Sequence, residues 1–98
     1  MIAYSTTTTG GALISALSAV SEAGTFSRLL AAHFSHSTDA NAVIRDGSGG
    51  SATGTILCTL RTVDEDEADD FTWPGEGYPL SDVYYDITTG GTLILYVE

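Results

Sequence analysis

Apolar and polar residues alternate most regularly in the stretch VYYDITTGGTLILYVE, residues 83–98. A period of two is the mark of a strand with one buried face. The sequence predicts a hairpin in which a five-residue connection, Thr88–Thr92, places Ile87 opposite Leu93. The parity of both strands then agrees, as strand register requires. The predicted buried face consists of Val83, Tyr85, Ile87, Leu93, Leu95 and Val97.

The other face of this expected hairpin is not purely polar. It carries Tyr84 opposite Tyr96 and Asp86 opposite Ile94. Aromatic cross-strand pairs stabilise a sheet by roughly 0.2–1 kcal/mol. Tyrosine is also among the residues enriched where proteins bind one another. These four residues are therefore candidates for a subunit interface.

Two further segments have the pattern of amphipathic strands. In Thr55–Val63, the apolar positions alternate with threonine and arginine, which predicts a strand that buries Ile56, Cys58 and Leu60. In Thr25–Ser37, one parity is mainly apolar, and the segment predicts a long strand that buries Phe26, Leu30, Ala32 and Phe34.

The remaining segments are less regular. Ala12–Val20 fits both a helix and a strand, and we favour a strand because Ser and Val weaken the helix. Ala42–Asp46 predicts a short strand, and Gly47–Gly54 a glycine-rich loop in solvent. The acidic run Asp64–Asp70 predicts a solvated loop, and Phe71–Leu80 an ordered loop with packed aromatic side chains.

These segments amount to six to eight short strands, separated by turn signals, with no convincing long helix. Such a series indicates an all-β fold, a small antiparallel β-sandwich or jelly-roll-like domain. We expect residues 12–98 to form this single domain and residues 1–11 to be a flexible arm or an edge strand.

Composition narrows the possible partners. Charged residues make up only 16% of the chain, and the formal net charge is −10, with three Arg and no Lys. A nucleic-acid backbone or an anionic membrane surface requires a basic footprint, so neither partner is expected. No apolar run is long enough to span a bilayer, and the first residues lack the basic region of a secretory signal. We expect synthesis in a cytosol.

Few residues could carry chemistry. Cys58 lies in line with Ile56 and Leu60, which predicts a buried, inert thiol. His33 and His36 would lie on opposite faces of a strand, without a carboxylate to complete a metal site. The acidic run has no Gly to fold it around calcium, although a weak cation site or a docking surface for a basic partner stays open. The glycine-rich loop has no Lys to bind phosphate. We expect no catalytic residue, no metal ligand and no cofactor.

The stretch FTWPGEGYPL contains Phe71, Trp73 and Tyr78. Aromatic side chains on a sandwich loop commonly close one end of the core or pack at a subunit interface. They can also form a platform for a sugar. Trp73 and Tyr78 are therefore added to the candidate interface residues.

Two stretches resemble a class of small bacteriophage proteins of about a hundred residues. The first is RDGSGGSATGTILCTL, and the second is FTWPGEGYPLSDVYYDITTGGTLILYVE. The class has a DG…G hairpin midway and an ending of alternating hydrophobic residues and tyrosines that closes on Glu. SRLLAAHFSHST is similar to its early strand and turn. The likeness covers most of residues 25–98, but this chain departs from it in the acidic run and at Val97, where a second Tyr is usual.

The resemblance implies a β-sandwich virion protein. A capsid decoration, or cement, protein would bind the assembled head through the major capsid protein and stabilise it. It would lie on the virion surface and form a homo-oligomer, for which a trimer matches the three-fold sites of capsid lattices. The alternative is a head-fibre or tail-associated module that binds carbohydrate or a receptor.

Overall fold

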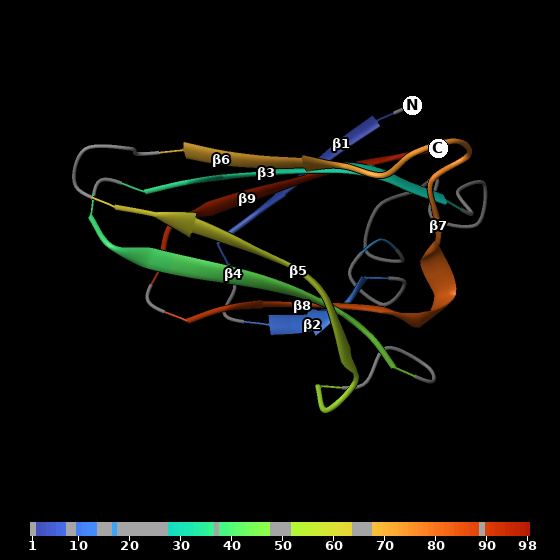
Figure 1. The fold of residues 1–98 in the computed structure, drawn as a ribbon, viewed down its shortest axis with the longest axis horizontal. Helices are drawn as coiled ribbons and strands as arrows, with labels where there is room; N and C mark the ends of the chain where they lie inside the picture. Colours follow the sequence, from blue (N-terminus) through green and yellow to red (C-terminus); the bar gives the residue numbers. More distant parts are fainter. Residues whose placement is uncertain are drawn as a thin grey trace.

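The computed structural model describes residues 2–7, 10–13, 17, 28–36, 38–47, 52–63, 68–88 and 90–98. These residues form nine strands in two facing sheets (Figure 1). Sheet A contains, in spatial order, β1 (Ile2–Thr6), β9 (Thr92–Val97), β3 (Arg28–Ser35) and β6 (Ala68–Thr72), with β7 (Tyr78–Pro79) also paired to β3. Sheet B contains β2 (Gly10–Ala12), β8 (Val83–Ile87), β4 (Ala40–Asp46) and β5 (Thr55–Thr62). A short 3-10 helix, η2 (Leu80–Asp82), leads into β8.

The strand order is that of a jelly roll. The chain passes from β3 in sheet A to β4 in sheet B and returns through β5 to β6. Both of the resulting pairs, β4 with β5 and β3 with β6, are antiparallel. The same relation joins β1 and β2 to β9 and β8. Two long arms folded across both sheets in this way define a jelly roll, so the expected all-β antiparallel sandwich is confirmed.

The last two strands confirm the predicted buried face but not the predicted hairpin. All six residues expected inside, from Val83 to Val97, are buried. However, β8 pairs with β2 and β4 in sheet B, whereas β9 pairs with β1 and β3 in sheet A. The connection therefore joins one sheet to the other. Both arrangements bury the same parity, so alternation alone cannot distinguish them.

Two irregularities in strand register overturn single predictions of burial. The register of β5 against β4 shifts between Ile44 and Arg45, where Ile44 pairs with Cys58 and Arg45 with Ile56. Ile56 consequently points outward and is 51% exposed, although it was expected inside. The register of β3 against β9 shifts between Leu29 and Ala31, so Leu29 is buried in place of Leu30. An extra residue in a strand reverses parity beyond it.

Several segments differ in secondary structure from their predictions, among them Phe71–Leu80, predicted as a loop, in which β7 pairs with β3. The strand expected over Ala12–Val20 is wrong at Leu13 and Leu17, which have helical backbone and are fully buried. Residues four positions apart share one face wherever the backbone is helical, which is the alternative that the sequence left open for this segment. The loop expected over Asp64–Asp70 is wrong from Ala68 onward, where β6 pairs with β3. Residues 64–67, like Phe26 and residues 48–51 of the glycine-rich loop, lie outside the described residues.

The core fills the space between the sheets. Its largest fully buried side chains include Phe34, Leu13, Leu17, Leu29, Ile44, Leu60 and Leu80. Polar groups also lie in the buried interior, and one of them, the Tyr85 side chain, forms hydrogen bonds with Tyr4 and Thr6. Burial and the bond to Tyr4 raise the pKa of Tyr85 above its usual value. Tyr85 is therefore a neutral member of the core.

Candidate interaction surfaces

The outer surface of sheet A is the first candidate site. The strand register aligns side chains in rows that run across β1, β9, β3 and β6. These rows lie on the side of the sheet away from sheet B. One row contains Ser5, Ile94, His33 and Asp70, and the next contains Ala3, Tyr96, Ala31 and Thr72. Thr92, Ser35 and Ala68 form the row on the other side. We call these residues the A face.

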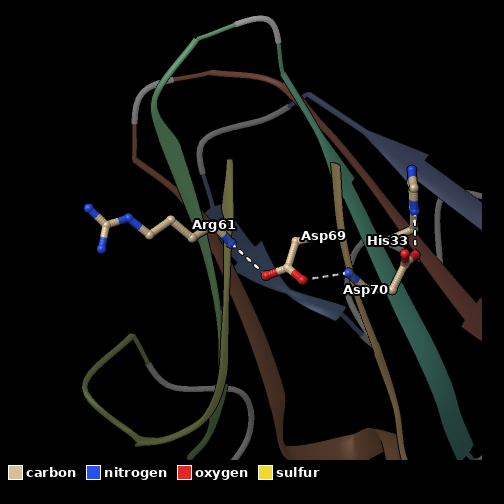
Figure 2. A network of polar contacts seen from close by, with 4 residues as sticks. All are labelled: His33, Arg61, Asp69 and Asp70. Atoms are coloured by element: carbon tan, nitrogen blue, oxygen red, sulfur yellow. Dashed lines mark hydrogen bonds and ion pairs between the residues drawn. The ribbon is translucent and has the colours of Figure 1, made fainter. Parts of the chain in front are cut away.

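The A face carries very little charge. Asp70 is its one acidic residue, although the chain contains 13 Asp and Glu. The Asp70 carboxylate contacts His33 Nδ1 on the neighbouring strand (Figure 2). This pair could not be expected from the sequence, because the two residues are 37 positions apart. Apart from this pair, Ile94 and Tyr96 stand among Ala, Ser and Thr, which makes the face flat and weakly polar.

The neighbouring carboxylate, Asp69, points the other way and closes a side of the sandwich (Figure 2). Its Oδ2 accepts a hydrogen bond from the backbone N–H of Arg61 at 3.0 Å, and its Oδ1 accepts one from the N–H of Asp70 at 2.9 Å. Arg61 belongs to β5, the edge strand of sheet B, and Asp69 to β6, the edge strand of sheet A. Asp69 therefore satisfies an edge donor that would otherwise be open to another strand.

The outer surface of sheet B is the second candidate site. One row across it contains Ala12, Tyr84, Arg45 and Ile56, and the next contains Gly10, Asp86, Val43 and Thr59. Asn41 and Arg61 form a third row. We call these residues the B face. Arg45 Nη1 donates a hydrogen bond to the carbonyl of Gly54 at 3.1 Å, which fixes the guanidinium above the sheet.

The four hairpin residues predicted as one interface lie on opposite sides of the molecule. Tyr96 and Ile94 belong to the A face, whereas Tyr84 and Asp86 belong to the B face. The predicted cross-strand contact between Tyr84 and Tyr96 is wrong because β8 and β9 are in different sheets. The structure thus divides one expected surface into two.

The two aromatic candidates from the loop serve the packing of the domain. Trp73 packs against the core, and its ring meets that of Phe71 edge to face, with centroids 4.7 Å apart. The Tyr78 hydroxyl donates a hydrogen bond to Asp46 at the end of β4. That bond, with burial, raises the pKa of Tyr78 to about 12. Of the three aromatic rings, Phe71 is the one counted among the exposed large hydrophobic residues.

The candidate chemical groups form no reactive constellation in the described part of the chain. Burial, reinforced by the charge of Asp69, raises the pKa of Cys58 to about 11, which keeps this half-buried thiol protonated. The described residues include no group of three His, Cys, Asp or Glu that could hold a metal ion.

A shallow depression of about 400 Å³ lies where β3 begins and β9 ends. Leu30, Gly75, Glu98, Arg28 and Glu76 line it. The Arg28 Nη2 and Glu76 Oε2 atoms are 4.0 Å apart, and the Glu76 side chain is 91% exposed. This open, solvated ion pair offers little binding energy.

Comparison with known proteins yields no matching family model, no matching curated protein and no matching solved structure. Among the described residues, no helix combines the length and apolar character needed to cross a membrane. The two outer faces are therefore the features of the molecule from which a function can be argued.

Proposed function

We propose that this protein is a structural component of a bacteriophage particle, a decoration protein that binds the assembled head and stabilises it. The resemblance described above supports the viral context. The jelly-roll fold is compatible with it, because jelly rolls occur in viral capsid proteins, although they also occur in lectins and cupins. Fold alone does not assign a function, so the proposal depends on what the two faces can bind.

The A face carries the proposal. In the rows that define the A face, a chain of net charge −10 has a single acidic residue, and that residue is paired with His33. Docking of this face against another protein would desolvate few charges. Removing charges from water is one of the free-energy costs of association, so this cost would be small. The centre of a protein interface is typically poor in charge and rich in tyrosine. Ile94 and Tyr96 supply the apolar contact, and the small neighbours allow close approach.

The partner we propose is the major capsid protein. A 98-residue domain has a modest core, so contact with the head or with further copies would add buried area. We propose a homo-oligomer on the virion surface, with a trimer as the state that matches a three-fold lattice site. Each copy would present its A face to the capsid.

Co-sedimentation with purified phage heads tests the A face. The double variant Ile94→Ser, Tyr96→Ser should stay folded by circular dichroism and bind heads at least about tenfold more weakly, the loss expected when central interface residues are truncated. Phe71→Ser is the matched control, since it removes an exposed aromatic side chain outside the A face. Unchanged binding by the double variant would exclude the A face as the docking surface, and no binding by the parent protein would exclude the function.

A carbohydrate-binding module is the second candidate. The exposed ring of Phe71 against Trp73 is the observation in its favour, because sugars stack on such rings. The structural contacts of Trp73 and Tyr78 leave little of those two side chains for a ligand. A glycan array, followed by titration of Trp73 fluorescence, would distinguish the two functions: saturable binding that Phe71→Ser removes would favour the carbohydrate module.

A further inference from the structure

The B face concentrates the positive charge of the chain. The sequence contains three arginines and no lysine, and two of the three, Arg45 and Arg61, lie on the B face. Asp86 is the one acidic residue in the rows that define it. The local balance is thus two positive charges against one negative, on a molecule whose net charge is −10.

The two guanidinium groups differ in exposure: that of Arg61 is open to a partner's carboxylate, whereas Arg45 is partly buried and its Nε is shielded from solvent. Within the described residues, neither Arg45 nor Arg61 forms an ion pair. The Arg61 side chain is exposed and points away from Asp69, which contacts only its backbone (Figure 2). Arg45 is held in place by its bond to the Gly54 carbonyl. A fixed guanidinium loses little conformational entropy when it binds a carboxylate.

The row that contains Arg45 also has the residue types that dominate binding energy. Tyr84 lies beside Arg45 on one side, and Ile56 lies on the other with half of its surface exposed. Tyr and Arg are enriched among residues whose truncation costs an interface most. A contact on this row would also cover the exposed Ile56 side chain.

We propose that the B face binds the acidic surface of a second copy of this chain. Charge selects this partner: outside the B face, the same chain carries nearly all of its 13 acidic residues and one remaining arginine. Contact between two B faces would bring surfaces of like sign together, so the two copies use different surfaces. A contact of this heterologous kind forms a closed ring when the rotation between copies closes. The inference rests on the homo-oligomer of the proposed function and names its surface.

Self-association of the purified protein, without phage heads, tests this surface. Sedimentation velocity of the parent protein should show oligomers at about 0.1 M salt that dissociate at about 1 M, where charges are screened within roughly 3 Å. Arg61→Glu should weaken self-association at least about tenfold, since reversing a charge at a contact replaces attraction by repulsion. Arg28→Glu, which makes the same charge change outside the B face, should retain it.

A mixing experiment separates two different surfaces from one shared surface. The Arg61→Glu protein keeps its acidic surface, so it should bind the B face of the parent protein and end the assembly, giving smaller complexes on addition. Failure of the variant to join the parent protein would exclude the heterologous contact. Self-association that is equal in the Arg61→Glu and Arg28→Glu proteins would overturn the B face while leaving an oligomer in place. A parent protein that stays monomeric at both salt concentrations would overturn this inference together with the proposed oligomer, whereas capsid binding is judged separately by co-sedimentation.

Discussion

At the scale of single residues, Tyr78 and Cys58 are, within the described part of the chain, the groups with large shifts in proton affinity. The bond to Asp46 raises the pKa of Tyr78 from 10.0 to about 12, and burial raises that of Cys58 from 9.0 to about 11. Both folded-state values exceed the ordinary ones, so the folded protein holds these protons more tightly than the unfolded chain. Their stabilising contribution is complete below about pH 9 and is lost as the pH rises towards 12.

We therefore expect stability to fall on the alkaline side, and Tyr78→Phe to make that fall shallower. Near pH 7 the variant should lose about 1 kcal/mol, the usual worth of one side-chain hydrogen bond. Urea unfolding at a series of pH values from neutral to about 11 measures both effects. Tyr96→Phe removes a hydroxyl from the A face and serves as the control. An alkaline slope that is the same in Tyr78→Phe and in the parent protein would show that the bond to Asp46 does not hold the proton.

Individual residues also show which features of the structure could be predicted from the sequence and which could not. Cys58 was predicted to be a buried, inert thiol; it is only half-buried, although its raised pKa keeps it protonated. Ile56, two residues earlier, was predicted to be buried and is exposed, because the register shift reverses parity between them. Nothing in TILCTLRTV marks the position of the shift. The pairing of His33 with Asp70 depends on β6 lying next to β3, and the sequence does not predict this strand order.

At the scale of elements, the edge strands β5 and β6 meet at one side of the sandwich. Asp69 on β6 accepts the backbone N–H of Arg61 on β5, whereas Asp70 on the opposite face of β6 contacts His33. Open edges invite pairing with another strand, and charged side chains placed on them prevent it. The two adjacent carboxylates therefore have separable roles, one at the edge and one on the A face.

Asp69→Ala should lower stability by about 1 kcal/mol and make the protein prone to β-aggregation, because the edge donor of β5 becomes free. Asp70→Ala is the matched control: it removes the neighbouring carboxylate and an exposed pair worth about 0–1 kcal/mol, while leaving the edge covered. Thioflavin T fluorescence on incubation, with urea unfolding, measures the difference. Equal aggregation by the two variants would contradict the role assigned to Asp69.

The strands themselves were largely predictable, whereas their partners were not. The sequence placed the strands near residues 28–35, 55–62, 83–87 and 92–97, because alternation reports which face of a strand is buried. It could not report that β8 and β9 belong to different sheets, since both pairings satisfy the same parity. This single difference of topology moved Tyr84 and Tyr96 to opposite surfaces and changed the candidate site from one interface into two.

At the scale of the whole molecule, charge acts on folding and on assembly in opposite directions. A net charge of −10 on a domain of this size makes the folded state repel itself. The same excess of carboxylates provides the proposed attraction to the B face of another copy. Salt should therefore strengthen the fold and weaken the assembly.

Melting curves in NaCl should show this opposition. We expect the Tm to rise between about 0.1 M and about 1 M salt as self-repulsion is screened. At the lower salt the Tm should also increase with protein concentration, as it does when association stabilises a folded chain, and at the higher salt this dependence should vanish. Replacing Asp64–Glu67 with Asn and Gln should flatten the salt response. A Tm that falls with salt would contradict the repulsion argument.

The pairing of Ile2 with Val97 has a mechanical consequence. The first and last strands are antiparallel neighbours, and the described chain enters and leaves the sandwich at the same end (Figure 1). Tension applied at those two points would separate β1 from β9 one residue pair at a time. The hydrogen bonds between the two strands would break in sequence, because the force would act on one pair at a time. Force applied to the outer faces would instead be resisted by the packed core between the two sheets. The proposed decoration protein should therefore be held by its faces and not by its ends.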